Sequence, residues 1–124
     1  MILMRILIYG AGVIGSLYAA LFAEAGYDTN IYARGKRLEA LRNNGLQYKK
    51  NQEVIKAEIR ILGELPNDDI YDFVLLTVRE NQLYEAMIEL KNNKISAPEI
   101  MISGIGQIAI YWKNRDSYIE VKDR

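Results

Sequence analysis

The chain has 124 residues, of which 50% are hydrophobic and 26% charged, as is usual for a globular domain. Its 16 basic and 16 acidic residues cancel, so no long-range field favours nucleic acid or an anionic membrane as a partner. Apolar runs are shorter than the roughly 18 residues of a membrane span, and we expect a cytoplasmic location. Cysteine and histidine are absent, which excludes disulfides and thiolate nucleophiles and removes the commonest transition-metal ligands, so we expect no metal site.

The first predicted element is a strand over residues 2–9, whose apolar run indicates burial on both faces. A helix follows over residues 13–25, because apolar residues recur there at helical spacing. Glu24 is its only charged residue, so we expect this helix to be covered on most sides. Gly26 then supplies a left-handed residue of the kind that commonly ends a helix.

A second strand over residues 27–33 is followed by the basic segment RGKR and a second helix that ends at Asn44-Gly45. Apolar and charged residues then alternate over 55–61, which predicts one strand with a solvated face. We expect it to form an antiparallel hairpin with residues 46–48.

The remaining elements are a buried parallel strand over residues 70–78, a helix over 80–93 and a strand over 99–104. Residues 108–124 are left open between a terminal hairpin and a tail. Strands and helices that alternate with short connections predict an α/β fold: a Rossmann-type, doubly wound, mostly parallel sheet with a small antiparallel hairpin. We expect residues 1–107 to form this domain.

A G-x-G-x-x-G pattern, formed by Gly10, Gly12 and Gly15, lies in the turn from the first strand into the first helix. In dinucleotide-binding folds the three glycines permit a tight turn, the approach of a pyrophosphate and close helix packing. The first amides of the helix then face the phosphates. Close packing alone is the alternative explanation, whereas a P-loop is excluded because no Gly-Lys-Ser/Thr follows. The predicted pyrophosphate site comprises Gly10, Ala11, Gly12, Val13, Ile14 and Gly15.

Arg34 follows the second strand, at the position where NAD enzymes generally carry an acid for the ribose 2′-hydroxyl. A carboxylate would repel a 2′-phosphate, whereas a guanidinium can bind two of its oxygens. Lys36 and Arg37 lie in the same turn, so the sequence predicts NADP(H) as cofactor, with Arg34 and Arg37 in its site. The alternative is a solvated basic helix start, although basic residues are mildly unfavourable at a helix N-terminus.

Four segments resemble the ketopantoate reductases (2-dehydropantoate 2-reductases), which reduce a 2-oxo acid with NADPH: ILIYGAGVIGSLYAALFAEAGYD, ARGKRLEALRNNGL, FVLLTVRENQ and ISGIG. The resemblance implies that Arg34 contacts the 2′-phosphate, and it adds Thr77, Arg79 and Ser103 to the expected cofactor site. Two positions depart from the family pattern. Arg79 replaces the lysine of Thr-x-Lys-x-x-Gln, and Ser103 replaces the asparagine of Asn-Gly-x-Gly. A surface arginine and a strand-end turn serine are the structural alternatives.

The family's helical domain, which carries the catalytic lysine and most substrate contacts, has no counterpart in these residues, because the last segment, IAIYWKNRDSYIEVKDR, does not resemble it. We therefore expect an NADP(H)-binding domain that is incomplete for catalysis alone, and we assign no catalytic residue. A 2-oxo acid partner is expected only with a second domain, and homo-oligomer formation is left open. Two alternatives are a non-catalytic nucleotide-sensing module, whose second strand generally ends in an acid, and a degenerate fragment that binds nothing and self-associates through its sheet edge.

Overall fold

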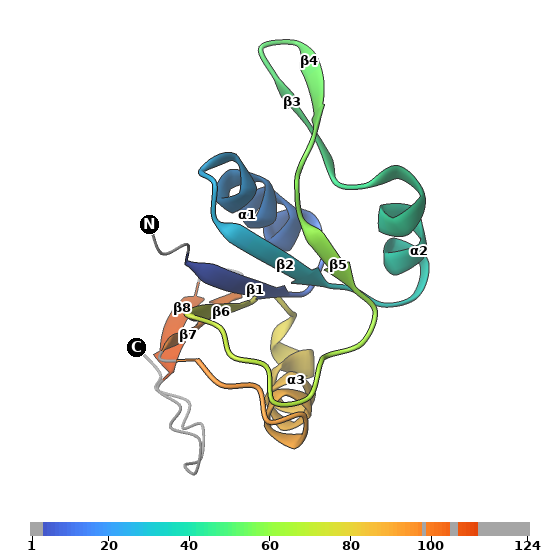
Figure 1. Ribbon diagram of the computed structural model, residues 1–124. Helices are drawn as coiled ribbons and strands as arrows, with labels where there is room; N and C mark the ends of the chain where they lie inside the picture. The colour runs from blue at the N-terminus through green and yellow to red at the C-terminus, as the bar shows by residue number, and fades with distance from the viewer. Residues whose placement is uncertain (1–3, 98, 105–106, 112–124) are drawn as a thin grey trace.

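The computed structural model describes residues 4–97, 99–104 and 107–111, which build one main sheet (Figure 1). The strand order in this sheet is β5-β2-β1-β6-β7-β8, and its members are parallel except for β8, which runs antiparallel to β7. Their bounds are Arg5–Tyr9 for β1, Asp28–Tyr32 for β2, Arg60–Leu62 for β5, Phe73–Leu76 for β6, Glu99–Gly104 for β7 and Gln107–Tyr111 for β8. The predicted Rossmann-type, mostly parallel fold is confirmed.

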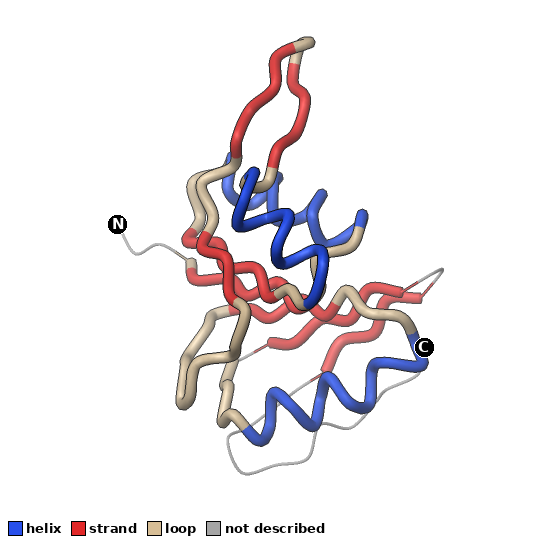
Figure 2. The backbone as a smooth tube through the Cα atoms, turned by 90° about the vertical axis from the view of Figure 1, so that its right-hand side faces the viewer, coloured by secondary structure: helices blue, strands red, loops and turns tan. Residues whose placement is uncertain are grey.

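Helices cover both faces of the sheet: α1 (Val13–Glu24) and α2 (Gly35–Asn44) lie on one face, and α3 (Glu80–Asn92) lies on the other (Figure 2). Successive residues of β1 alternate between the two resulting cores. Ile6 and Ile8 pack in the α1–α2 layer, whereas Leu7 and Tyr9 pack in the α3 layer. The buried apolar run of β1 therefore reflects a strand that is covered on both sides.

The segment after α2 departs from the prediction of one long strand over residues 55–61. β3 (Gln47–Lys50) and β4 (Glu53–Lys56) form the expected antiparallel pair, joined through Asn51 and Gln52, which both have positive φ. The run then breaks, and β5 instead pairs in parallel with β2 at the edge of the main sheet. The predicted antiparallel hairpin is confirmed. The prediction of one strand over residues 55–61 is wrong, because the segment is divided between β4, which pairs with β3, and β5, which pairs with β2.

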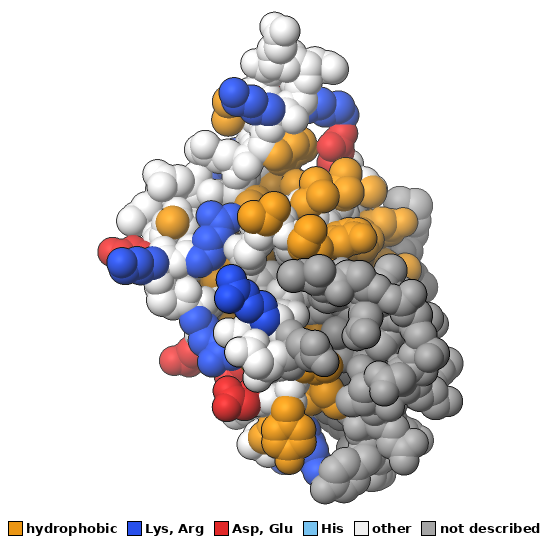
Figure 3. Space-filling view, turned by 180° about the vertical axis from the view of Figure 1, so that it is seen from behind, with side chains coloured by type: hydrophobic (Ala, Val, Ile, Leu, Met, Phe, Trp, Pro, Cys, Tyr) orange, Lys and Arg blue, Asp and Glu red, His pale blue; other side chains and the backbone are white. Residues whose placement is uncertain are grey.

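The expectation that α1 is covered on most sides is also wrong. Only Gly15, Ala19 and Ala20 are buried in this helix. An apolar stripe faces outward and comprises Val13, Ile14, Leu17, Tyr18 and Leu21, each 36% exposed or more. Figure 3 shows hydrophobic side chains gathered on the surface of this part of the molecule. The small residues lie against the sheet because only they allow close approach, and this leaves the large ones on the other face.

The C-terminal segment is described only in part. Residues 107–111 form β8, which lies beside β7. The rest of the predicted tail or terminal hairpin, residues 112–124, lies outside the described residues. Within the part of the chain that the structure describes, no helix is both long and apolar enough to cross a membrane.

An ion-pair network at the amino edge of the sheet ties β1 to the segment before β6. The Arg5 guanidinium donates to both carboxylate oxygens of Asp69 at 2.7 and 3.2 Å and to the Ile70 carbonyl at 3.0 Å. Tyr71 donates its hydroxyl to the same carboxylate at 2.6 Å. Burial opposes ionisation of Asp69, but the hydrogen bonds from Arg5 and Tyr71 outweigh it and lower its pKa below the ordinary 3.8.

Replacing Asp69 with Asn should lower the free energy of unfolding by about 1–2 kcal/mol at neutral pH, because charge-assisted hydrogen bonds in a partly exposed pair are lost. Since the folded state lowers the pKa of Asp69, the wild-type advantage is full above the ordinary value of 3.8 and disappears as the pH falls through the lowered pKa. Urea denaturation at several pH values measures both effects. Asp68→Asn, at an exposed neighbour, is the matched control, and equal losses in the two variants would contradict the assignment.

Candidate functional site

The candidate site lies at the carboxyl edge of the parallel strands. β1 pairs with β2 on one side and with β6 on the other, so the chain order of the sheet reverses around β1. In open α/β sheets, the crevice at this reversal is where ligands bind. The glycine turn after Tyr9, the start of α2 and the start of α3 all meet here.

Gly10 and Gly15 bring α1 close to the end of β1. Gly10 has φ +116°, a conformation that side chains rarely adopt. A Cβ atom at Gly15 would lie 2.0 Å from the Gly10 carbonyl oxygen and 2.5 Å from Thr77 Oγ1. Thr77 donates its hydroxyl to that same carbonyl at 2.9 Å. Thr77 therefore stabilises the glycine turn through its hydrogen bond to the Gly10 carbonyl.

Gly12 differs from the other two glycines, because a Cβ atom there would meet nothing within 4 Å. It is the N-cap of α1, and no side chain forms a capping hydrogen bond to this helix end, whose first turn also lacks an acidic residue. The helix dipole and its free first amides make such an end attractive to anions. Bare backbone, open space and a partial positive charge thus coincide at Gly12.

Arg37 of α2 braces the glycine turn. Its Nε donates to the Ala11 carbonyl at 2.8 Å, and its Nη2 donates to Ser16 Oγ at 2.9 Å. The side chain therefore links α2 to the first turn of α1, and its guanidinium adds positive charge beside the helix end.

Arg34 belongs to a cluster of four polar side chains. It donates to the Tyr9 hydroxyl at 2.7 Å and pairs with Glu89 of α3 at 3.4 Å. Tyr9 and Tyr32 are register partners on β1 and β2, and both donate their hydroxyls to the Glu89 carboxylate. Burial, followed by the bond to Glu89, raises the pKa of both phenols, so they remain protonated donors.

The glycine turn, the two tyrosines, Arg34 and Arg37 border a cleft of about 530 Å³. Its floor is the glycine turn, and its walls come from the end of β2, the start of α2 and the start of α3. The lining residues are Tyr9, Gly10, Ala11, Gly12, Tyr32, Ala33, Arg34, Arg37, Val78, Gln82 and Glu85. Five of the predicted site residues therefore meet in one cavity: Gly10, Ala11, Gly12, Arg34 and Arg37.

The other predicted residues lie around the cleft without lining it. Gly15 is buried beneath the turn, and Val13 and Ile14 have exposed side chains in the first turn of α1. Thr77 supports Gly10, and Arg79 is the exposed N-cap residue of α3. Ser103 is near the carboxyl end of β7, and its side chain lies outside the described residues, as do residues 105–106 of the ISGIG segment.

Sequence analysis missed Tyr9, Tyr32, Gln82, Glu85 and Glu89. The tyrosines were assigned only as strand residues, although both end their strands at the edge where ligands bind. Gln82 lay within the segment TVRENQ but was not assigned a role. The two acids belong to α3, and nothing in the local sequence indicates which helix faces Arg34.

The cleft is chemically suited to holding an anion beside a small organic body. It offers backbone amides, two guanidiniums and aromatic rings, and the Tyr9 and Tyr32 centroids lie 4.9 Å apart. No group of three or more potential metal-ligating side chains occurs among the residues that the structure describes.

Comparison with known proteins identifies similar chains. The family model described as ketopantoate reductase PanE/ApbA matches residues 6–106. A 2-dehydropantoate 2-reductase of Mesorhizobium japonicum is 36% identical over 88 residues, which cover 70% of this chain and 27% of the relative. A second such relative, from Pyrococcus horikoshii, is covered over 29% of its length, so the chain spans less than a third of these relatives.

Solved structures agree in fold. A PanE/ApbA family ketopantoate reductase from Ralstonia eutropha superposes with a TM-score of 0.64 at 23% identity, covering 73% of this chain and 30% of that one. D-mandelate dehydrogenase in a ternary structure with NADH and anilino(oxo)acetate superposes with a TM-score of 0.68 at 22% identity, covering 82% and 33%. At these identities the likeness concerns the fold alone.

Replacing Gly15 with Ala should lower the free energy of unfolding by about 3 kcal/mol, because the new methyl group would overlap backbone that cannot move aside. Gly12→Ala is the matched control, since it adds the same atom where space is open and should cost less than about 1 kcal/mol. Thermal or urea unfolding of both variants measures the difference. Equal destabilisation would contradict the separate roles of the two glycines.

Proposed function

The chain belongs to the ketopantoate reductase family over residues 6–106, and on this premise we propose that residues 1–107 form an NADP(H)-binding domain for the reduction of a 2-oxo acid such as 2-dehydropantoate. The observation that carries the proposal is the cleft in which the open backbone at Gly12, the uncapped start of α1 and Arg34 face one another. A dinucleotide needs these features together: room for a diphosphate, donors for it and a recognition group at the ribose.

The residues present fit the cofactor. The backbone of Gly10 to Gly12 and the first amides of α1, at Val13 and Ile14, would hold the pyrophosphate, because no side chain fills the space beside Gly12. Arg37 would keep the turn in place through its bond to Ala11. The adenosine would lie between the end of β2 and α3, where Val78 and Gln82 line the cleft.

Arg34 supports NADP(H) over NAD(H). The fold by itself does not choose, since the D-mandelate dehydrogenase structure of similar fold contains NADH. A guanidinium at the end of β2 can bind a 2′-phosphate through two parallel hydrogen bonds. Arg34 is exposed over 65% of its side chain, so its remaining donors can reach a ligand in the cleft.

The nicotinamide end of the cofactor would extend toward Thr77, Arg79 and the end of β7 at Ser103. When bound, the cofactor supplies the hydride. Such a transfer also needs a substrate held at near-attack distance and a group that protonates the new alkoxide. Tyr9 does not fit that role, because it already donates its proton to Glu89 and its pKa is raised.

Replacing Arg34 with Gln should weaken NADPH binding by about 10- to 100-fold, because hydrogen bonds to charged groups contribute about 1.5–3 kcal/mol. Affinity for NADH should change by less than about threefold, since NADH lacks the 2′-phosphate. Titration calorimetry or fluorescence with both nucleotides measures this ratio. Lys36→Gln, two residues along the chain, is the control. Equal affinities of the wild-type chain for NADH and NADPH, or no affinity for either, would count against the proposal.

The 124 residues alone should not oxidise NADPH in the presence of 2-dehydropantoate, because the reaction also needs a group that protonates the new alkoxide, and we assign none among the described residues. Following the absorbance of NADPH tests this expectation, with a full-length family member as positive control. Turnover by the isolated chain would show that the missing groups are present after all. A nucleotide-sensing module would instead change its oligomeric state on binding nucleotide, which light scattering detects.

A further inference from the structure

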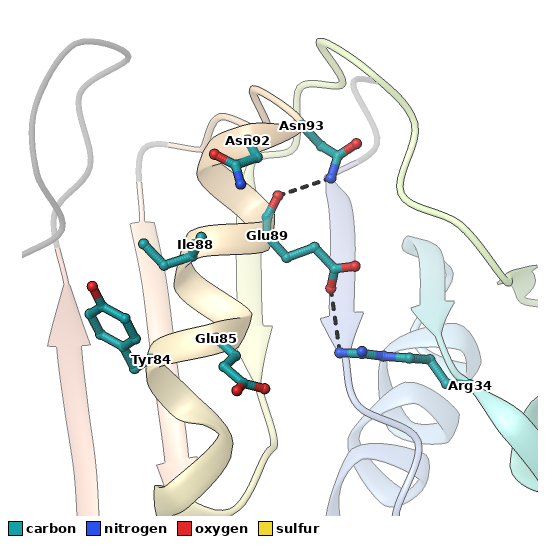
Figure 4. Close-up of a pocket in the computed structure, with 7 residues that line it drawn as sticks. All are labelled: Arg34, Tyr84, Glu85, Ile88, Glu89, Asn92 and Asn93. Atoms are coloured by element: carbon teal, nitrogen blue, oxygen red, sulfur yellow. Dashed lines mark hydrogen bonds and ion pairs between the residues drawn. The ribbon is translucent and has the colours of Figure 1, made fainter.

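Glu89 is an acidic residue directly opposite the guanidinium that is expected to recognise the cofactor. It extends from the last turn of α3 toward Arg34, as Figure 4 shows, and the two side chains pair at 3.4 Å. This is the only ion pair of Arg34 among the described residues. A phosphate that approached Arg34 would therefore meet a carboxylate already bound to it.

The two tyrosines hold Glu89 in this position. Tyr32 donates to Oε2 at 2.9 Å, and Tyr9 donates to Oε1, the oxygen that also faces Arg34. The phenols come from two adjacent strands and are themselves buried, 2% exposed at Tyr9 and 5% at Tyr32. Since both oxygens are bonded to rigid strands, the carboxylate cannot swing away without leaving buried hydroxyls unpaired.

The pair itself is weak enough to be exchanged. The side chains of Arg34 and Glu89 are 65% and 30% exposed, and ion pairs in such surroundings contribute little to stability. A ribose 2′-phosphate carries more negative charge than a carboxylate and binds a guanidinium through two oxygens.

We propose that Glu89 sets the cofactor specificity of the cleft by competing with the ribose 2′-phosphate for Arg34. This inference rests on the proposed NADP(H)-binding function and adds a residue that limits the preference for the phosphorylated cofactor. Glu89 acts through Arg34 and is thus a positioning residue. The acid faces the end of β2 from another element of the fold and weakens the advantage that Arg34 would otherwise give to NADP(H).

The test compares two probes that differ by one group, adenosine 2′,5′-bisphosphate and adenosine 5′-monophosphate. Glu89→Gln removes the charge and keeps the shape of the side chain, with one oxygen that can still accept from a tyrosine hydroxyl. The ratio of affinities for the two probes should rise about two- to fivefold in this variant, which corresponds to the loss of one partly screened charge contact. Affinity for the monophosphate should stay constant. Glu58→Gln, an exposed acid outside the cleft, controls for the loss of net charge.

A double-mutant cycle with Arg34→Gln separates competition for Arg34 from a general charge effect. If Glu89 acts through Arg34, Glu89→Gln should leave the ratio unchanged in the Arg34→Gln background. A rise of the same size in that background would overturn the inference, and so would an unchanged ratio for Glu89→Gln alone. Should Gln at position 89 unfold the chain, Glu89→Asp shortens the reach to Arg34 and should raise the ratio in the same direction.

The failure of the proposed function gives a different result. If the wild-type chain binds neither probe, or if Arg34→Gln does not change the ratio, the cleft does not recognise the 2′-phosphate, and both statements fall. If the wild-type ratio depends on Arg34 but not on Glu89, only the role of Glu89 is overturned.

Discussion

The contact on which the site depends is the close approach of Gly15 to the Gly10 carbonyl. A hydrogen atom in place of a side chain at Gly15 lets α1 begin against the end of β1, and the hydroxyl of Thr77, the residue after β6, donates to the same carbonyl. This packing directs the uncapped start of α1 into the crevice between strands. Gly12 can remain open to a ligand because Gly10 and Gly15 supply the turn and the packing.

The second organising feature is the polar cluster of Tyr9, Tyr32, Arg34 and Glu89 at the ends of β1 and β2. The rings of Tyr9 and Tyr32 pack in the core, so their hydroxyls have fixed positions at the ends of β1 and β2. These hydroxyls hold the side chains of Glu89 and Arg34 in place. Arg34 lines the cleft, and Glu89 lies beside it as its ion-pair partner. The proposed preference among nucleotides would depend on the balance between these two charges, and not on the residue after β2 alone.

Membership in the ketopantoate reductase family, which rests on residues 6–106, agrees with the geometry of the cleft. The family model matches residues 6–106, whereas the curated relatives are more than three times as long as the segment aligned with this chain. The apolar stripe on α1, from Val13 to Leu21, is a further exposed surface, which the described residues leave uncovered.

The sequence by itself determined the order of strands and helices, the glycine turn and the positive charge after β2. Each of these is a local property: apolar runs, helical spacing and glycine positions depend on neighbours along the chain. Only the tertiary structure decided that residues 55–61 divide between two partners, that α1 turns its small residues inward, and that Glu89 faces Arg34. The reason is that these features depend on which surfaces meet across the sheet, and Arg34 and Glu89 are brought together by a fold that places α3 beside β1 and β2.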